Sequence, residues 1–393
     1  MENYMNLDHI SANPLLREVK EVMIEAIEND YHNPSNQHRA GEQAAEQIEN
    51  ARQKVAELIH AAAPKEIVFT SGGTESVNHA IKGVAAANKE KGKHIVTTNI
   101  EHNSVHRSLK RLKSAGFKIT SLPVDESGRV YPKDVEDAIT DETILVSVMH
   151  SNNETGTIQP IAEIGRITRK KNVLFHTDAV DSVGIVPVDV QSLNVDLMSF
   201  AANTFYGPQG VGGLYIRRGT RIFPLLEGGV QENNKRAGTE NLIGISGMGK
   251  AAELASRDLN ARYAHLSELK QYFLEQLPGY LDDYLINTNL EHSLPHLVSI
   301  SIRYIEGESV MLMLDEEGIA VSTKSACATG SLRASHVLLS LGLSHADAQG
   351  TLVIAFGMEN TREDIRRFLT ALKQVVETLR NMSPLYKKTT QTA

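Results

Sequence analysis

The stretch Phe69-Thr70-Ser71-Gly72-Gly73-Thr74-Glu75-Ser76 carries the pattern that decides the fold. An apolar run over 66–70 predicts a strand, small residues follow it, and the spacing of apolar residues then predicts a helix over 76–88. At such a turn the backbone N–H groups and the positive end of the helix favour a phosphate, with the Thr74 hydroxyl as a further donor. Small residues also permit a tight turn for its own sake, so this stretch alone leaves both interpretations open.

Outward from this turn, short apolar runs alternate with helical patterns through the first two-thirds of the chain. The further predicted strands are 94–98, 143–149, 173–177, 196–200 and 212–216. Strands that are apolar throughout and alternate with helices are typical of a mainly parallel sheet covered by helices on both faces. We therefore predict an α/β fold built on such a sheet.

The last third of the chain is organised differently. A long helical pattern over 241–277 precedes predicted strands at 296–303, 319–322 and 352–356 and a final helix over 362–379. This is an α+β unit of the size of a small domain. The predicted divisions are an N-terminal segment over 1–14, a large domain over 15–255 and a small C-terminal domain over 256–393.

Bulk composition excludes several classes of protein. The 393 residues carry a net charge of −8, so there is no overall basic excess for non-specific binding to nucleic acid. No stretch approaches the roughly 20 apolar residues of a membrane span, and the first residues lack the basic start and apolar run of a signal peptide. We expect a cytoplasmic protein that binds neither nucleic acid nor membrane. Its single cysteine, Cys327, excludes internal disulfides.

Polar residues follow several predicted strands, which is where open α/β sheets gather their ligands. Asp178 ends one apolar strand and is either a helix cap or the partner of a protonated ring nitrogen such as that of pyridoxal phosphate (PLP). The loop 149–156, which contains Asn153, and the pair Glu101-His102 follow two other strands. We expect these loops to form one polar cleft.

A loop of small residues over 322–330 contains the only thiol, Cys327. Such a loop is a poor core element, so the sequence favours a functional thiol over a buried apolar one. The neighbouring Lys324 would lower the thiol pKa and favour the thiolate.

Taken in order, these stretches resemble the cysteine desulfurases of the NifS/IscS class, within the class-V aminotransferase group of fold-type I PLP proteins. The shared motifs cover nearly the whole chain and are Tyr4 with Asp8, 33–38, 70–75, 101–102, 152–156, 176–179, 205–212, 228–232, 236–239 and 325–327. The resemblance implies an aspartate aminotransferase-like fold, with a seven-stranded-type sheet flanked by helices and a smaller α+β C-terminal domain, in a homodimer.

The resemblance also implies the roles of the site residues. Gly73 and Thr74 would hold the PLP phosphate, with Thr239 reaching it from the second subunit. His102 would stack on the cofactor ring. Asn153 would contact the ring hydroxyl, and Asp178 would pair with the ring nitrogen. Cys327 would take the sulfur of L-cysteine and carry it as a persulfide to an iron–sulfur scaffold protein or a thiolation enzyme.

The sequence departs from this family at five positions. The family's Ser-x-His-Lys is here Ala201-Ala202-Asn203-Thr204, so a threonine replaces the lysine that attaches the cofactor and moves the substrate's α-proton. Ala201 and Asn203 replace two phosphate ligands. The other two changes are Asp181, for a glutamine at the cofactor hydroxyl, and Val353, for the arginine that clamps the substrate carboxylate. PLP would then bind non-covalently, and neither Lys324 nor Lys235 obviously substitutes for the lysine.

Two hypotheses follow. In the first, the protein is a cysteine desulfurase-like enzyme of iron–sulfur cluster assembly with impaired PLP chemistry, and it carries sulfur on Cys327. In the second, it is a catalytically degenerate dimeric platform that docks the scaffold protein and contributes Cys327 as a relay or as one ligand of a shared iron–sulfur cluster. An ordinary aminotransferase or lyase is disfavoured, because it needs the missing lysine and has no use for the Cys327 loop.

Overall fold

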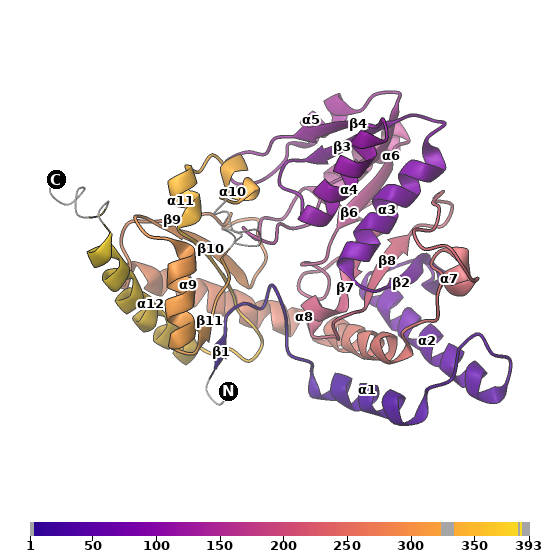
Figure 1. Cartoon of the computed structure of the whole chain (residues 1–393), viewed down its shortest axis with the longest axis horizontal. Helices are drawn as coiled ribbons and strands as arrows, with labels where there is room; N and C mark the ends of the chain where they lie inside the picture. Colours follow the sequence, from indigo (N-terminus) through magenta and orange to yellow (C-terminus); the bar gives the residue numbers. More distant parts are fainter. Residues whose placement is uncertain (1–3, 324–333, 384–385, 387–393) are drawn as a thin grey trace.

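The computed structural model describes residues 4–323, 334–383 and 386. A large unit, indigo to pink in Figure 1, contains the main sheet, and a smaller unit in orange and yellow lies beside it. The long helix α8 (Leu242–Gln276) contributes buried residues to both. Its residues up to Ala255 belong to the large core, and those from Leu266 onward belong to the small one.

The main sheet has seven strands in the order β2-β8-β7-β6-β5-β3-β4. Their bounds are β2 (Ile67–Thr70), β3 (His94–Thr98), β4 (Lys118–Leu122), β5 (Thr143–Ser147), β6 (Leu174–Asp178), β7 (Leu197–Ala201) and β8 (Gly212–Ile216). Only β8 runs antiparallel to its neighbours β2 and β7. The predicted mainly parallel sheet is confirmed.

Helices cover both faces of this sheet (Figure 1). On one face α3 (Gly73–Asn88) and α4 (Asn103–Ser114) pack on alternate strand residues such as Ile95 and Leu145. On the other, α2 (Arg39–Leu58), α6 (Ile161–Lys171) and α8 pack on the residues between them, such as Val96 and Val146. Both sides of each central strand are therefore buried, which explains why these strands are apolar throughout.

The small unit is an antiparallel three-stranded sheet of order β12-β10-β9 with helices packed on it. Its elements are β9 (Tyr284–Ile286), β10 (Leu297–Ile302), α9 (Gly307–Glu316), β11 (Ile319–Ala320), α10 (His336–Ser340), α11 (His345–Gln349), β12 (Thr351–Ala355) and α12 (Arg362–Met382). The strand β1 (Met5–Asn6) pairs with β11, so the N-terminal segment joins this unit. The domain boundaries at 14 and 255 stay a prediction.

The remaining elements are short or peripheral. They are α1 (Arg17–Asn29), α5 (Pro132–Ala138), α7 (Gln231–Asn234) and the 3-10 turns η1 (Pro64–Glu66), η2 (Ala202–Phe205) and η3 (Leu277–Gly279). Among the described residues, no helix combines the length and the apolarity that a membrane crossing requires.

Candidate functional site

A cavity of about 310 Å³ lies at the carboxyl ends of the parallel strands. The residues that line it are Ile10, Ser11, Gly73, Thr74, His102, Ser104, Asn153, Asp178, Val180, Asp181, Ala201, Asn203 and Thr204. Of the seven residues predicted for the site, five therefore border one cavity. Thr239 is exposed and does not line it, and Cys327 lies outside the described residues.

The turn before α3 approaches its neighbours closely. Gly72 has φ +146°, and a Cβ on Gly73 would meet the Val180 side chain at 2.5 Å. Only glycine at position 73 therefore lets the start of the helix pass so near Val180. As the first residues of the helix, Gly73 and Thr74 have N–H groups without an intrahelical acceptor, next to the cavity. This geometry suits an anion such as a phosphate.

Carboxylates outside the cavity hold this turn in place. Glu75 accepts a hydrogen bond from Ser71 N at 2.7 Å and another from Arg236 Nε at 3.0 Å. Burial opposes the ionisation of Glu75, but the hydrogen bonds from Arg236 and Ser71 lower its pKa below the usual value. Glu75 therefore stays charged and links the turn to the segment that contains Arg236.

A second carboxylate, that of Glu232, holds Phe69, the residue just before the turn. Glu232 is buried, and its oxygens accept hydrogen bonds from Phe69 N at 2.8 Å and from the Arg52 guanidinium at 2.6 and 2.8 Å. Glu232 and Asn233 have φ values of +48° and +55°, which non-glycine residues rarely adopt. The two ion pairs thus bind the segment 232–236 to β2 and to the turn that follows it.

Asp178 stands at the end of β6 with its carboxylate facing the cavity. Val180 N donates to Oδ1 at 3.2 Å, and burial raises the pKa of Asp178 to about 6. One buried carboxylate in such a position is a suitable partner for a protonated ring nitrogen. The pair would be strongest above pH 6, where Asp178 is ionised.

Glu101 and His102 enter the site at the start of α4. Glu101 is fully buried and accepts hydrogen bonds from the Thr98 hydroxyl at 2.7 Å and from Met149 N at 3.0 Å, and burial raises its pKa to about 8. His102 Nδ1 accepts from Ser104 N at 3.1 Å and caps the helix, which leaves the exposed ring at the cavity. Sequence reasoning identified this pair, but did not foresee that Glu101 lies behind the site.

Thr204 occupies the predicted place of the missing lysine. It is buried in η2, and its hydroxyl donates to Ala201 O at 3.0 Å, so it closes a local turn. Ala201, Asn203 and Asp181 border the same cavity, whose described lining includes no lysine. Lys235 lies outside that lining, and Lys324 is outside the described residues.

Val353, the fifth departure, is fully buried in β12. It packs with the core of the large unit although β12 belongs to the small sheet. Its side chain therefore faces the junction between the two units, and it offers no charge to a carboxylate.

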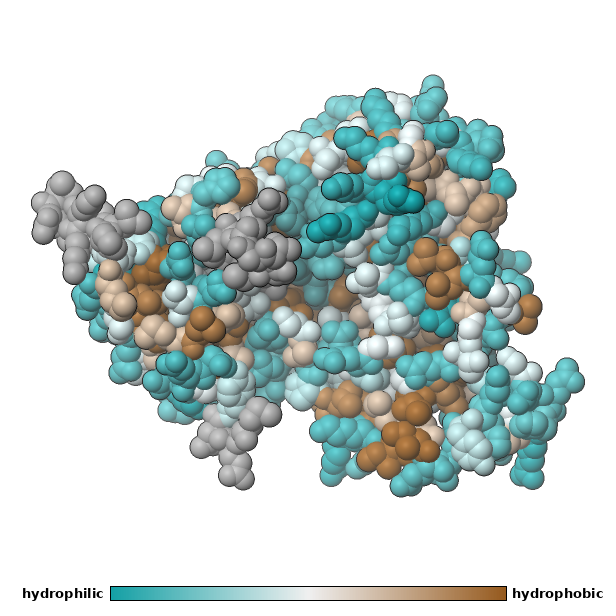
Figure 2. Space-filling view, in the orientation of Figure 1, coloured by the Kyte–Doolittle hydropathy of each residue, from teal (hydrophilic) through white to brown (hydrophobic). Residues whose placement is uncertain are grey.

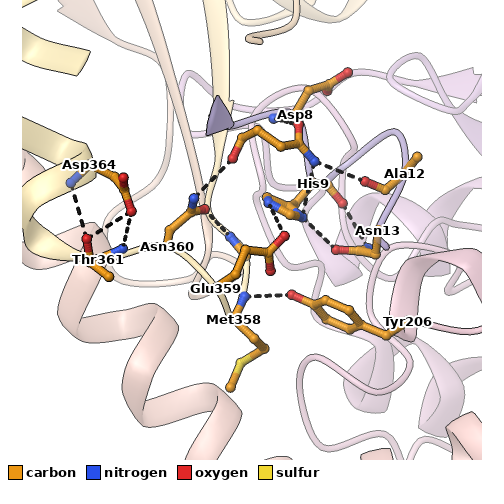
Figure 3. Close-up of polar contacts among 12 residues, drawn as sticks. Asp8, His9, Ala12, Asn13, Tyr206, Met358, Glu359, Asn360, Thr361 and Asp364 are labelled. Atoms are coloured by element: carbon orange, nitrogen blue, oxygen red, sulfur yellow. Dashed lines mark hydrogen bonds and ion pairs between the residues drawn. The ribbon is translucent and has the colours of Figure 1, made fainter. Parts of the chain in front are cut away.

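The altered segment is also bonded to the N-terminal residues. Figure 3 shows how those residues, and Tyr206 after the segment, contact the small unit. Asn13 Nδ2 donates to the carbonyl oxygens of Asn203 and Thr204 at 3.2 and 3.1 Å, and Asn13 Oδ1 lies 2.9 Å from His9 Nδ1. The Tyr206 hydroxyl accepts from Met358 N at 2.7 Å. These contacts hold the backbone of 203–206 in place whatever side chain stands at 204.

The segment that follows the Cys327 loop is anchored at the cavity rim. Ser335 hydrogen-bonds to Glu154, and His336 Nε2 lies 3.0 Å from Glu101 O. The His336 ring also meets the His106 ring edge-on, with 4.9 Å between centroids. Within the described ranges no group of three or more His, Cys, Asp or Glu side chains is arranged to hold a metal ion.

Comparison with known proteins gives the family. The profile of the aminotransferase class-V family matches residues 5–368. This chain belongs to that family. Cysteine desulfurase IscS of Dictyoglomus turgidum is 47% identical over 388 residues, which are 99% of this chain and 98% of the relative. Cysteine desulfurase IscS of Methanosarcina thermophila is 46% identical over 97% of this chain and 94% of the relative.

Solved structures agree with the fold. A NifS-like protein superposes with a TM-score of 0.90 at 37% identity, covering 96% of this chain and all of the other. A NifS-like protein from Rickettsia africae gives 0.86 at 28% identity, covering 95% of this chain and all of the other. The predicted fold-type I, aminotransferase-like architecture and the relationship to the NifS/IscS class are confirmed.

The family implies PLP as cofactor, and the cavity fits it in part. The close turn at Gly73 with its free N–H groups matches a phosphate, and the buried Asp178 matches a pyridine nitrogen. No described lining residue has an amine for covalent attachment. The cavity thus fits a PLP held without a covalent bond.

Proposed function

We propose that this protein is a cysteine desulfurase-like sulfur carrier of iron–sulfur cluster assembly, which binds PLP non-covalently. The observation that carries the proposal is that Gly73, Thr74 and Asp178 border the same cavity as Thr204, the residue in the lysine's place. The IscS relatives at 43–47% identity support the sulfur chemistry. Cytoplasmic location and a homodimer are part of this proposal.

Five of the lining residues would hold the cofactor. The N–H groups of Gly73 and Thr74 would bind the phosphate, and Asp178 would pair with the ring nitrogen. By the resemblance, Asn153 would contact the ring hydroxyl and His102 would stack on the ring. Bound PLP supplies an acceptor for the electrons of the substrate's α-carbon. Thr239 is exposed on the segment after Arg236, and by the resemblance it would reach the cofactor phosphate in the second subunit.

Removal of the substrate's α-proton is the step that this chain is least suited to catalyse. The Thr204 hydroxyl donates its proton to Ala201 O, and a neutral alcohol is too weak a base to accept the α-proton. Loss of a positioned acid–base group lowers the rate by about 10²–10⁴-fold. Val353 gives the substrate carboxylate no counter-charge. Cys327 carries the sulfur as a persulfide. The sulfur comes from L-cysteine, which is converted slowly, or from another sulfur donor.

The same observations favour a second candidate, a dimeric platform without turnover. Four altered residues border the cavity and the fifth lies at the junction of the two units. In this case the protein docks an iron–sulfur scaffold protein, and Cys327 serves as a relay or as one ligand of a cluster that the scaffold completes. The retained fold then serves binding alone.

One experiment on the full chain separates the two candidates. Purified protein with PLP and L-cysteine is assayed for sulfide in the presence of a thiol, beside Cys327→Ser. Slow sulfide release that Cys327→Ser abolishes supports the first candidate; no release above that of free PLP contradicts it. Cys327-dependent co-purification with an iron–sulfur scaffold protein supports the second candidate, and absence of any complex contradicts it.

A further inference from the structure

Two of the departures from the family change the charge of the same cavity in the same direction. Thr204 removes the amine of the family's lysine, and Asp181 adds a carboxylate where the family has a neutral glutamine. Both residues line the cavity of about 310 Å³. Relative to the family, this cavity has therefore lost a group that carries positive charge and gained a group that carries negative charge.

Asp178 adds to the negative charge around the cavity. Its carboxyl group is buried, faces the same space and stands three residues before Asp181 in the chain. The described lining contains no lysine or arginine, and its only histidine is His102. Two carboxylates that line one cavity both attract a cationic ligand. The described lining thus favours a ligand that brings positive charge of its own.

The turn that contains Thr204 does not fill the place of the missing amine. The Thr204 hydroxyl donates to Ala201 O at 3.0 Å, so it is engaged within its own turn. Asn13 holds the backbone of this turn through hydrogen bonds to the carbonyl oxygens of Asn203 and Thr204. A threonine side chain is also shorter than a lysine side chain. Thr204 therefore borders the cavity without reaching as far into it as a lysine would.

A cofactor that carries its own amine would suit this end of the cavity. In pyridoxamine phosphate (PMP), the amine form of PLP, the nitrogen is bonded to the same carbon that a lysine nitrogen bonds in covalently attached PLP. The ring hydroxyl occupies the neighbouring position of the ring. By the resemblance, Asp181 stands opposite that hydroxyl and Thr204 stands in the lysine's place. The ammonium group of PMP would therefore lie near both residues.

The rest of the cavity suits PMP and PLP equally. Both carry the phosphate that the N–H groups of Gly73 and Thr74 would hold, and both carry the ring nitrogen that Asp178 would meet. The two forms differ only at the carbon next to the ring hydroxyl. PLP has a neutral aldehyde there, and no described lining residue has an amine that could bond to it.

We propose that this cavity selects PMP over PLP, with the Asp181 carboxylate holding the ammonium group. The proposal rests on the cofactor site of the proposed function and names the form of the cofactor that this site prefers. L-Cysteine enters PLP chemistry through the aldehyde, which PMP lacks. A subunit that holds PMP therefore takes up no L-cysteine, and sulfide release is limited to the smaller fraction of subunits that hold PLP.

The test measures the binding of three ligands to the full-length protein by equilibrium dialysis. PMP carries the ammonium group, pyridoxine phosphate carries a neutral hydroxyl on the same carbon, and PLP carries the aldehyde. Hydrophilic side chains cover most of the face shown in Figure 2, so pyridoxine phosphate also measures any binding of the phosphate group elsewhere on the surface.

Two variants test whether Asp181 accounts for the preference. Asp181→Asn keeps the size of the side chain and removes its charge. Asp141→Asn is the matched control: Asp141 is exposed and precedes β5, so it lies at the amino ends of the parallel strands, opposite the edge that forms the cavity. Thermal unfolding checks that both variants fold. The three ligands on the wild type test the proposal even if Asp181→Asn does not fold.

We expect the wild type to bind PMP at least about tenfold more tightly than either pyridoxine phosphate or PLP, because only PMP forms the ion pair. Asp181→Asn should reduce both ratios to less than about threefold, and Asp141→Asn should leave them unchanged.

The contrary outcomes separate this proposal from the proposed function. Binding of all three ligands with equal affinity, or an undiminished preference for PMP in Asp181→Asn, would overturn the selection of PMP and leave the cofactor site standing. Absence of binding by all three ligands would overturn the cofactor site and this proposal together.

Discussion

Two segments border the same cavity and have diverged from their family to different extents. The turn 70–75 keeps the full motif, and two carboxylates outside the cavity, Glu75 and Glu232, hold it through Ser71 N and Phe69 N. The segment 201–204 has lost three functional side chains, yet its backbone is still fixed by Asn13 and by the Thr204–Ala201 hydrogen bond. The turn that would bind the cofactor phosphate is therefore retained, whereas the segment that would attach the cofactor covalently, and that holds two further phosphate ligands in the family, has changed.

Restoring the lysine should remove this difference between the segments. In Thr204→Lys, a primary amine enters the cavity proposed to hold the cofactor, so covalent attachment of PLP should rise from undetectable to nearly one per subunit. Borohydride reduction followed by mass spectrometry measures it. Thr204→Arg is the matched control, since it adds length and charge without a nucleophilic amine. Equal labelling of both variants, or none in Thr204→Lys, would contradict the separation of the two roles.

Removing a buried carboxylate should show how firmly the conserved turn is supported. Glu232→Gln leaves the buried Arg52 without its buried carboxylate partner, and this should lower the free energy of unfolding by about 3–5 kcal/mol. Glu49 contacts the same guanidinium at 3.0 Å, but its side chain is 59% exposed. Glu49→Gln should therefore cost less than about 1 kcal/mol. Urea unfolding measures both variants, and similar losses would mean that Glu232 does not anchor β2.

The ionisation of Asp178 should make the affinity for PLP depend on pH. Loss of one charge-assisted hydrogen bond in Asp178→Asn should weaken PLP about 10–100-fold, equivalent to about 1.5–3 kcal/mol. Because the pKa of Asp178 is raised to about 6, PLP affinity of the wild type should rise as pH increases from 5 to 7 and the carboxylate ionises. Absorbance titration measures the affinity.

The control for Asp178 lies in the same cavity. Asp181→Asn makes the same change of charge at another residue that lines the cavity. By the resemblance, the Asp181 carboxylate would oppose the cofactor hydroxyl, so this variant should not weaken PLP binding. A loss in Asp181→Asn equal to that in Asp178→Asn, or an unchanged pH profile in Asp178→Asn, would mean that Asp178 does not meet the ring nitrogen.

The smallest effect is expected at Glu75. In Glu75→Gln the turn keeps one hydrogen bond and loses its ion pair with Arg236, so PLP should bind about 2–10-fold more weakly. Pyridoxal, which has no phosphate, tests where the loss arises. If Glu75→Gln weakens the binding of pyridoxal as much as the binding of PLP, Glu75 supports the whole cavity and not the phosphate turn in particular.

The fold could be predicted wherever burial imposed a pattern. Strands such as β3, β5, β6 and β8 were predicted because they are almost wholly buried and contain short runs of apolar residues. The edge strand β4 was missed, because most of its side chains are partly or fully exposed and it has no apolar run. The cavity could also be foreseen, since the carboxyl ends of parallel strands meet at one edge.

Long-range partners could not be predicted. Nothing in the pattern around Arg52 indicates a partner 180 residues away at Glu232, and nothing near Asn13 points to the carbonyls of 203–204. Such pairs arise only when the chain is folded. The roles of Thr239 and of Cys327, which lies outside the described residues, stay predictions.

The most direct measurement is made on the wild-type protein. Full-length protein is saturated with PLP, its absorption spectrum is recorded, and it is then treated with borohydride and digested for mass spectrometry. The predicted result is bound PLP that gel filtration removes, with no lysine peptide bearing a reduced adduct. A stoichiometric adduct on any lysine, with Lys324 and Lys235 as the first to inspect, would contradict the claim that this family member holds its cofactor without a covalent bond.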